Sequence, residues 1–304
     1  MNVWLKRVGI GLGALILVVA VGGGIFFWTR MSAFDASLAK VYDVPLPKLE
    51  RSSDPAVLAR GKHIAEAVYG CGAGDCHGPD LGGGKMMAMG PLGTITGPNV
   101  TAGGLGMAYS DGELARLLRH GIKKDGRSVR FMPAQDLEWL PDSDLRALIS
   151  HLRTLPPVSK ANGPIELKPL AKFLDRIDAI PLDIARRIDH AKAGRGPAPS
   201  ATKEYGALLG RTCTGCHGAK LSGGPIPGAP AEIPIPSNIT PDESGLKGWT
   251  FEDFEKLLVQ GIRKNGKKLD PFMPIEAFGK LDETEKRALF LFLQSLPPTP
   301  FGNR

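Results

Sequence analysis

The chain has 304 residues, which is enough for two ordinary domains, and its composition is that of a folded globular protein. Its net charge is +7, three basic residues lie in the first thirty, and no basic run with interleaved aromatic residues follows. We therefore expect no nucleic-acid partner. The high counts of glycine (39) and proline (26) predict short helices joined by ordered loops.

The first predicted element is a membrane-spanning helix at residues 8–28, a stretch without a single charge. As a helix it would measure about 31 Å, enough to cross a bilayer. Lys6 and Arg7 precede it and only Arg30 follows closely, which places the amino terminus in the cytoplasm. The alternative is a cleaved signal peptide, but the apolar core is long and no good small-x-small cleavage site follows it, so we favour an uncleaved anchor.

Beyond the anchor, the chain contains two copies of one sequence unit, about 140 residues apart. Residues 117–157 match residues 257–298 through a Gly-Ile-Lys/Arg-Lys-x-Gly turn, a Phe-Met-Pro triplet and a final segment ending in Leu-Pro-Pro. Upstream, Pro-Asn-Val-Thr at 98–101 matches Ser-Asn-Ile-Thr at 237–240. Such agreement at a shared offset indicates a tandem repeat.

Each copy is predicted to be helical. Ser110 with Glu113, and Thr250 with Asp253, form capping-box patterns before an apolar face of helical period, and a glycine ends each segment. No segment of the repeat shows sustained alternation of period two, so we expect an all-α fold. The linker between the copies contains a possible basic amphipathic helix at 179–192.

The division along the chain follows from these signals. We predict a cytoplasmic N-terminus at 1–7, a transmembrane anchor at 8–28, a stalk at 29–52, a first domain at 53–157, a linker at 158–200 and a second domain at 201–300. The two domains are called the first and the second repeat below.

The strongest chemical signal lies in the second repeat, where Cys213, Cys216 and His217 form a C-x-x-C-H motif. This motif is typical of covalent haem c attachment. Two thiols at this spacing reach the two vinyl groups of one porphyrin, and the adjacent histidine ligates the iron. A redox dithiol or half of a zinc site are the alternatives. Zinc would need two further ligands, and the adjacent histidine favours haem.

Two methionines are the predicted sixth iron ligands. Met132 and Met273 occupy the centre of the repeated Phe-Met-Pro triplet, at closely matched intervals after His77 and His217. A thioether is a soft ligand suited to haem iron, and the following proline fixes the local backbone. A lone methionine would be interpreted as core packing, but recurrence at one place in both copies favours ligation.

The first repeat departs from the motif, since Cys71, Cys76 and His77 form C-x-x-x-x-C-H. The two extra residues must loop out for both thiols to reach one porphyrin, and Gly72 and Gly74 make such a loop feasible. The alternative is a disulfide between the two cysteines in a domain without haem. We favour a second haem because both iron ligands are present at matched spacing.

Asn99 and Asn238 each begin an Asn-x-Thr sequon, which can signal glycosylation. Their equivalent positions in the repeat instead predict a loop near the haem, in which the side chains bind a propionate or the loop backbone.

With these motifs the chain resembles tandem class I cytochrome c domains, and in particular the membrane-associated cytochrome c subunit of bacterial alcohol and sugar-acid dehydrogenases. The similarity covers about 53–158 and 201–300, through C-T-G-C-H-G, N-I-T-P-D followed by G-W-T, G-I-R-K-N-G, F-M-P and L-P-P. The resemblance implies short helices around each haem, His/Met ligation and electron transfer. Those subunits generally carry three haems, whereas this chain has two motifs, the first of them lengthened.

We therefore expect a dihaem cytochrome with two covalently bound haems c and no catalytic residues, anchored in the bacterial inner membrane with both domains in the periplasm. It would pass electrons from a dehydrogenase or quinol-linked donor to an oxidase or a soluble cytochrome. One alternative is a dihaem enzyme such as a peroxidase, although two methionine ligands would close the iron positions that catalysis needs. Another alternative is a cytochrome subunit of a larger respiratory complex.

Overall fold

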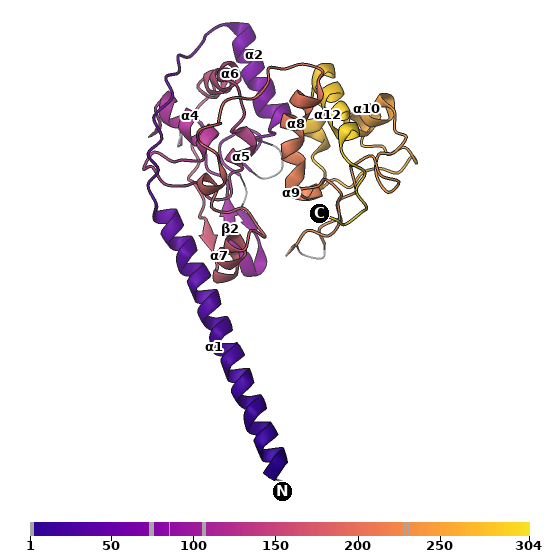
Figure 1. Ribbon diagram of the computed structural model, residues 1–304. Helices are drawn as coiled ribbons and strands as arrows, with labels where there is room; N and C mark the ends of the chain where they lie inside the picture. The colour runs from indigo at the N-terminus through magenta and orange to yellow at the C-terminus, as the bar shows by residue number, and fades with distance from the viewer. Residues whose placement is uncertain (1–2, 73–75, 85, 105–107, 228, 230–231) are drawn as a thin grey trace.

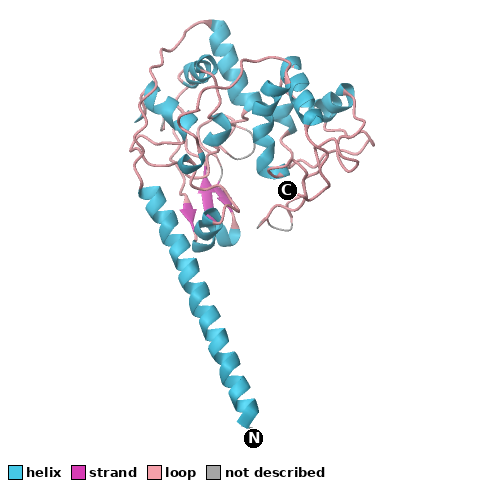
Figure 2. Ribbon diagram, viewed as in Figure 1, coloured by secondary structure: helices cyan, strands magenta, loops and turns pink. Residues whose placement is uncertain are grey.

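The computed structural model describes residues 3–72, 76–84, 86–104, 108–227, 229 and 232–304. Most of the regular structure is helical, as predicted, and a small antiparallel sheet lies beside it (Figure 2). The α-helices are α1 Val3–Ala39, α2 Pro55–His63, α4 Asp111–His120, α5 Ala134–Leu137, α6 Asp142–Leu152, α7 Pro169–Arg176, α8 Lys203–Gly210, α9 Thr214–His217, α10 Phe251–Gln260, α11 Ile275–Phe278 and α12 Glu283–Ser295.

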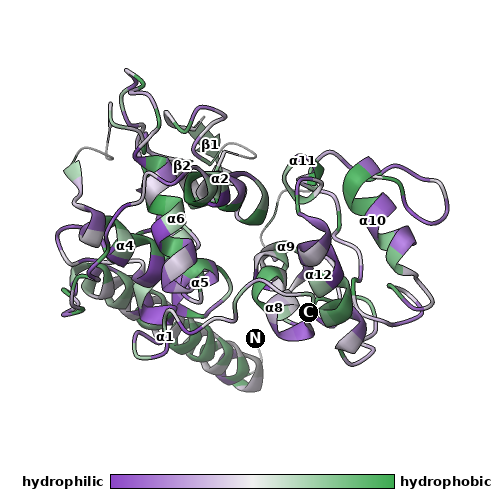
Figure 3. Cartoon of the chain, turned by 90° about the horizontal axis from the view of Figure 1, so that it is seen from above, coloured by the Kyte–Doolittle hydropathy of each residue, from purple (hydrophilic) through white to green (hydrophobic). Residues whose placement is uncertain are grey.

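Helix α1 projects from the rest of the molecule and is apolar along most of its length (Figures 1 and 3). Among the described residues it is the one helix long and apolar enough to cross a membrane, and its most apolar window is not buried by other parts of the chain. The helix continues through Ala39, so the first part of the predicted stalk is helical. Phe34 in this part is buried against the linker, which fixes the helix to the first repeat.

Each repeat is built on two helices that cross at a glycine. In the first repeat α2 crosses α6, and a Cβ atom at Gly61 would lie 1.9 Å from the carbonyl oxygen of Ala147. In the second repeat α8 crosses α12, and a Cβ atom at Gly206 would lie 1.9 Å from the carbonyl oxygen of Ala288. The same close approach at equivalent positions supports the interpretation of the chain as a tandem repeat.

Helices α4 and α10 begin and end where the sequence predicts. Both capping boxes are formed, by Ser110 with Glu113 and by Thr250 with Asp253, so two otherwise unpaired N–H groups are satisfied at each start. Gly121 and Gly261 end these helices in the left-handed region, with φ of 62° and 66°.

The sheet is the part of the fold that the all-α prediction missed. It consists of β1 Met86–Ala88, β2 Gly93–Thr96 and β3 Glu166–Leu167, paired antiparallel in that order. These strands are too short to produce a visible alternation of period two. Strand β3 comes from the linker, so the sheet ties the start of the linker to the first repeat.

The predicted helix at 179–192 is wrong. The structure places the linker helix earlier, at α7, where Pro169 occupies the first turn and suits a helix start. Residues 179–192 contain only the 3₁₀ turn Ala185–Arg187 and a β-bridge between Asp183 and Arg130. The charged side chains of this segment are used in tertiary contacts, since Arg186 and Arg187 both contact the buried Asp175.

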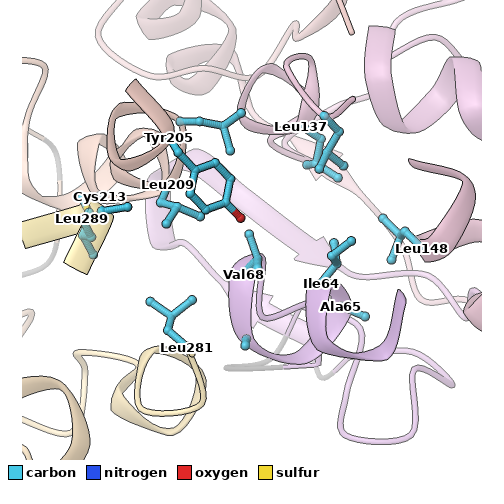
Figure 4. Packing of buried hydrophobic residues seen from close by; sticks show 14 of the residues in the cluster. Ile64, Ala65, Val68, Leu137, Leu148, Tyr205, Leu209, Cys213, Leu281 and Leu289 are labelled. Carbon is cyan, nitrogen blue, oxygen red and sulfur yellow. The ribbon is translucent and has the colours of Figure 1, made fainter. Parts of the chain in front are cut away.

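The two repeats share one hydrophobic core. Side chains from the π-helical turn Ile64–Val68, which follows α2, and from α6 pack in the same cluster as side chains from α8 and α12 (Figure 4). Ile64, Val68 and Tyr205 are buried members of this cluster. The repeats therefore form one packed unit rather than two separated domains.

A partly buried ionic network lies in the same interface. The Arg60 guanidinium donates to both carboxylate oxygens of Asp144, at 3.2 and 2.8 Å, and to Glu285 Oε1 at 2.9 Å. It also donates to the Tyr205 hydroxyl at 3.2 Å, and His63 Nε2 lies 2.6 Å from Glu285 Oε2. Asp144 of α6 and Glu285 of α12 occupy equivalent positions in the two repeats. Arg60 therefore binds the acidic residue at this position of each repeat.

Candidate haem sites

In the second repeat, all three residues of the attachment motif lie within one helical turn. The 3₁₀ turn Arg211–Cys213 continues α8 and leads directly into α9. Cys213, Cys216 and His217 are therefore spaced i, i+3 and i+4 along a helical stretch, which brings their side chains to one face. This arrangement fits a flat cofactor held by two thioethers and one imidazole.

The histidines of both motifs have the same orientation. His217 Nδ1 lies 2.7 Å from the Ser237 carbonyl oxygen, and His77 Nδ1 lies 2.8 Å from the Pro98 carbonyl oxygen. Because a carbonyl can only accept, Nδ1 must carry the proton, and the lone pair of Nε2 is left for a metal. Burial lowers the pKa of both histidines, which keeps the imidazoles in the neutral form that ligates iron.

The loops that supply these carbonyl groups are held by buried asparagines. Asn238 accepts hydrogen bonds from the Thr240 N–H and hydroxyl at 2.9 and 2.8 Å, and donates to the Thr299 carbonyl at 2.7 Å. Asn99 makes the equivalent bonds with Thr101 and with the Val158 carbonyl. Both asparagines are buried, so neither is accessible for glycosylation, and the predicted bonding to the loop backbone is present.

The first repeat reaches the same histidine geometry by a longer path. Helix α2 ends in the π-helical turn Ile64–Val68, and Gly70 then reverses the chain with φ of 53°. The His77 N–H donates to the Cys71 carbonyl at 3.2 Å, which closes the lengthened motif. Gly72 is needed here, since a Cβ atom would lie 2.8 Å from the Gly78 carbonyl oxygen. The other predicted loop glycine, Gly74, lies outside the described residues.

The first cysteine of each motif lies in an apolar environment. Burial raises the pKa of Cys71 and of Cys213 to about 12. A redox-active dithiol needs a thiolate stabilised near neutral pH, so these environments disfavour that alternative. Cys71 is a thiol in this structure and is not part of a disulfide.

The two methionines lie in turns that agree in backbone form at the proline but differ at the phenylalanine, since Phe131 has a φ of 68° and Phe272 has no positive φ. Pro133 and Pro274 have nearly equal φ and ψ, at −79° and 59° against −76° and 64°. In each turn the methionine is partly buried while the preceding phenylalanine is exposed. A turn that exposes the larger apolar residue and covers the methionine suits a ligand role, and ligation by Met132 and Met273 stays a prediction.

Two arginines that the sequence did not single out hold the second motif. Arg211 donates to the Gln135 carbonyl and to Glu138 at 2.9 Å each, and its guanidinium lies 5.3 Å from the ring centre of Trp139. Arg304 donates to the Cys216 carbonyl at 2.8 Å. Arg211 adjoins the motif in sequence, but its partners belong to the other repeat, and Arg304 lies beyond the repeat, so no local signal identifies either contact.

Comparison with known proteins gives relatives that are cytochrome subunits. No protein-family model matches the chain. It is 39% identical over 109 residues to the cytochrome c subunit of a quinone-dependent alcohol dehydrogenase from Gluconobacter oxydans, which covers 33% of this chain and 22% of the relative. It is 30% identical over 103 residues to the fructose dehydrogenase cytochrome subunit of Gluconobacter japonicus, covering 32% of this chain and 21% of the relative.

A third relative agrees with these two. The chain is 32% identical over 116 residues to the gluconate 2-dehydrogenase cytochrome c subunit of Pantoea cypripedii, covering 35% of this chain and 26% of the relative. The matched region thus spans about a quarter or less of each relative. Over about a third of its length, the chain is similar to the cytochrome c subunits of bacterial dehydrogenases, as the sequence motifs predicted.

Proposed function

We propose that the protein is a membrane-anchored dihaem c-type cytochrome that transfers electrons and performs no bond chemistry itself. The observation that carries the proposal is the repeated histidine site, in which Nδ1 is bound to a loop carbonyl and Nε2 is left as a ligand. The similarity to named cytochrome subunits of dehydrogenases supports an electron-transfer role rather than a catalytic one.

The residues that would hold the haems follow from the two motifs. Cys71 and Cys76 would attach the first haem and Cys213 and Cys216 the second. His77 with Met132, and His217 with Met273, would ligate the irons. When bound, haem supplies an iron that alternates between the ferric and ferrous states. The chain would attach it through the cysteines and fix the imidazole tautomer, and its short helices would limit contact of the haem with water.

The proposed donor is a dehydrogenase, because the relatives are named as subunits of alcohol, fructose and gluconate dehydrogenases. A quinol-linked donor is the second possibility. The acceptor would be an oxidase or a soluble cytochrome. Helix α1 would anchor the protein in the bacterial inner membrane, with both repeats in the periplasm, where covalent haem attachment takes place. The protein would transfer electrons in the same way if it were a subunit of a larger respiratory complex.

The axial methionines provide the test that separates a carrier from an enzyme. If both ligate, the ferric protein has two low-spin six-coordinate haems and shows the weak sulfur-to-iron absorption band in the near infrared. Replacing Met273 with His should remove half of that band, keep the haem low-spin and lower its reduction potential, because imidazole stabilises ferric iron more than a thioether does. Met132→His should do the same at the other haem.

An exposed methionine gives the matched control. Met86 has no counterpart in the second repeat and is exposed, so Met86→His should leave the band and both potentials unchanged. A high-spin haem in the wild-type protein, together with turnover of peroxide, would overturn the carrier assignment in favour of a dihaem enzyme.

A further inference from the structure

The linker helix α7 lies against the anchor at the end of its uncharged stretch. The ring centre of Phe173 is 5.9 Å from that of Phe26 and 5.0 Å from that of Phe27. Phe26 and Phe27 belong to residues 8–28, the stretch predicted to cross the bilayer. Helix α7 is drawn beside α1 in Figure 1, below most of the first repeat. A side chain that touches the last turn of a membrane span lies at the membrane boundary.

One face of α7 is firmly attached to the protein. Ala171 and Asp175, four residues apart, are fully buried, and Ala171 packs with Phe34 of α1. Lys172 forms an ion pair with Asp35 of α1 at 2.8 Å, and the Arg176 guanidinium lies 5.4 Å from the ring centre of Phe34. These contacts join α7 to the continuation of the anchor, so α1 and α7 keep a fixed relation to each other.

A different face of α7 carries an apolar stripe that the described residues cover only in part: Phe173 lies against Phe26 and Phe27, and the stripe residues on either side of it are exposed. Leu170 and Phe173, spaced i and i+3, lie on one side of the helix, and Ile177, the residue that follows its last turn, continues this stripe at i+7. Leu170 and Ile177 are 39% and 45% exposed. Single exposed apolar residues are common, but here the middle member of the stripe touches the span itself. If lipid surrounds Phe26 and Phe27, the same lipid contacts Leu170, Phe173 and Ile177.

Basic side chains accompany the stripe. Lys168, just before the helix, and Arg30, just after the span, are both exposed. A short helix with an apolar face and adjacent basic residues is the pattern that binds the interfacial region of a bilayer, where lysine and arginine meet lipid phosphates.

We infer that α7 lies in the surface of the lipid bilayer that α1 crosses, with Leu170, Phe173 and Ile177 in the boundary between headgroups and acyl chains. This inference rests on the anchor of the proposed function. Its consequence is that the first repeat has a fixed orientation and height above the membrane. The protein is thus held at two points rather than suspended from a flexible stalk.

Cysteine accessibility in lipid vesicles tests the inference. Single Leu170→Cys and Ile177→Cys variants of the haem-loaded full-length protein are placed in vesicles of phosphatidylethanolamine and phosphatidylglycerol. The measurement is the ratio of alkylation rates by a charged and an uncharged maleimide. Leu291→Cys is the matched control, because Leu291 is 46% exposed and lies on α12, far from α7 along the chain. Leu15→Cys reports on the span, and wild-type protein gives the background.

The expected ratio at Leu170→Cys and Ile177→Cys is lower than at Leu291→Cys by about tenfold, because lipid excludes the charged reagent. Equal ratios at all three positions, with the charged reagent still excluded from Leu15→Cys, would overturn the inference and leave the anchor intact. If the charged maleimide alkylated the Leu15→Cys variant readily, residues 8–28 would not lie in the bilayer. That result would overturn the anchor and, with it, the placement of α7.

Discussion

The buried asparagine of each repeat is the residue that connects the histidine loop to the segment after the final helix of that repeat. Asn238 accepts a hydrogen bond from the Thr240 N–H and donates one to the Thr299 carbonyl. The carbonyl of its neighbour Ser237 accepts a hydrogen bond from Nδ1–H of His217. Asn238→Ala would leave the buried Thr240 N–H without its acceptor and the Thr299 carbonyl with only the Thr240 hydroxyl, at 3.3 Å, as a donor. An unsatisfied buried group of this kind typically costs about 1–3 kcal/mol. We expect a lower free energy of unfolding in guanidinium titrations of the haem-loaded protein.

The control for this substitution is Asn303→Ala, because Asn303 is exposed and its side chain bonds only to Lys220 among the contacts described for it. Its expected effect is within about 0.5 kcal/mol. Equal unfolding curves for Asn238→Ala and Asn303→Ala would contradict the structural role given to the buried asparagine.

We expect His63 to make the stability of the interface depend on pH. Its hydrogen bond to Glu285 raises the pKa of His63, against burial and the nearby Arg60. A raised folded-state pKa means that the stabilisation is complete below the ordinary histidine value and is lost as pH rises through the folded value. For Glu285, burial alone would raise the pKa, but its hydrogen bonds to His63 and Arg60 lower it, so its contribution is lost only in acid.

The prediction is therefore that His63→Gln destabilises the protein more at about pH 6 than at about pH 9. Chemical unfolding at the two pH values measures the difference. Lys62→Gln is the control, because Lys62 is exposed and its contact with Glu66 is long, at 3.9 Å. A destabilisation by His63→Gln that is the same at both pH values would show that the imidazolium–carboxylate pair is not formed.

At the scale of the helices, the crossing glycines set how closely the two main helices of each repeat approach. At Gly206 an added Cβ atom meets the backbone of Ala288, which cannot move without displacing α12. We expect Gly206→Ala to destabilise the protein by about 1–3 kcal/mol, as overpacking typically does. Gly61→Ala should do the same at the α2–α6 crossing.

Gly215 supplies the control, because it is also helical and, among the described residues outside its own helical turn, no atom lies within 4 Å of a Cβ placed there. Thermal unfolding of Gly206→Ala and Gly215→Ala in parallel compares the two sites. If Gly215→Ala lowered the unfolding temperature as much as Gly206→Ala, the close crossing of α8 and α12 would not explain why residue 206 is a glycine.

Local signals explain which elements could be predicted. The starts and ends of α4 and α10 follow from capping residues and glycines that lie next to one another in sequence. Helix α7 was missed because its sequence is short and its position is fixed by contacts with α1. The orientation of His77 and His217 could not be predicted either, because the accepting carbonyl groups lie about twenty residues away along the chain.

At the scale of the whole molecule, the interface repeats the internal symmetry of the chain. Arg60 and Tyr205 each precede the crossing glycine of their repeat, and Asp144 and Glu285 are equivalent acids. The four side chains meet across the shared core. The repeat itself could be predicted from the sequence. The contact between these four side chains could not, because nothing in the sequence indicates that Arg60 and Tyr205, at equivalent positions of the two repeats, contact each other. Because the repeats share this core and this network, we expect the two proposed haems to keep a fixed relation to each other.

The central claim is that both repeats bind haem. The first repeat has a lengthened motif, yet its histidine has the same contact as that of the second repeat. The most direct test is the pyridine haemochrome measured against the protein concentration of the purified full-length chain. Our account predicts a ratio close to two haems per chain. A ratio close to one, with a normal c-type spectrum, would assign haem to the second repeat alone and contradict the dihaem assignment.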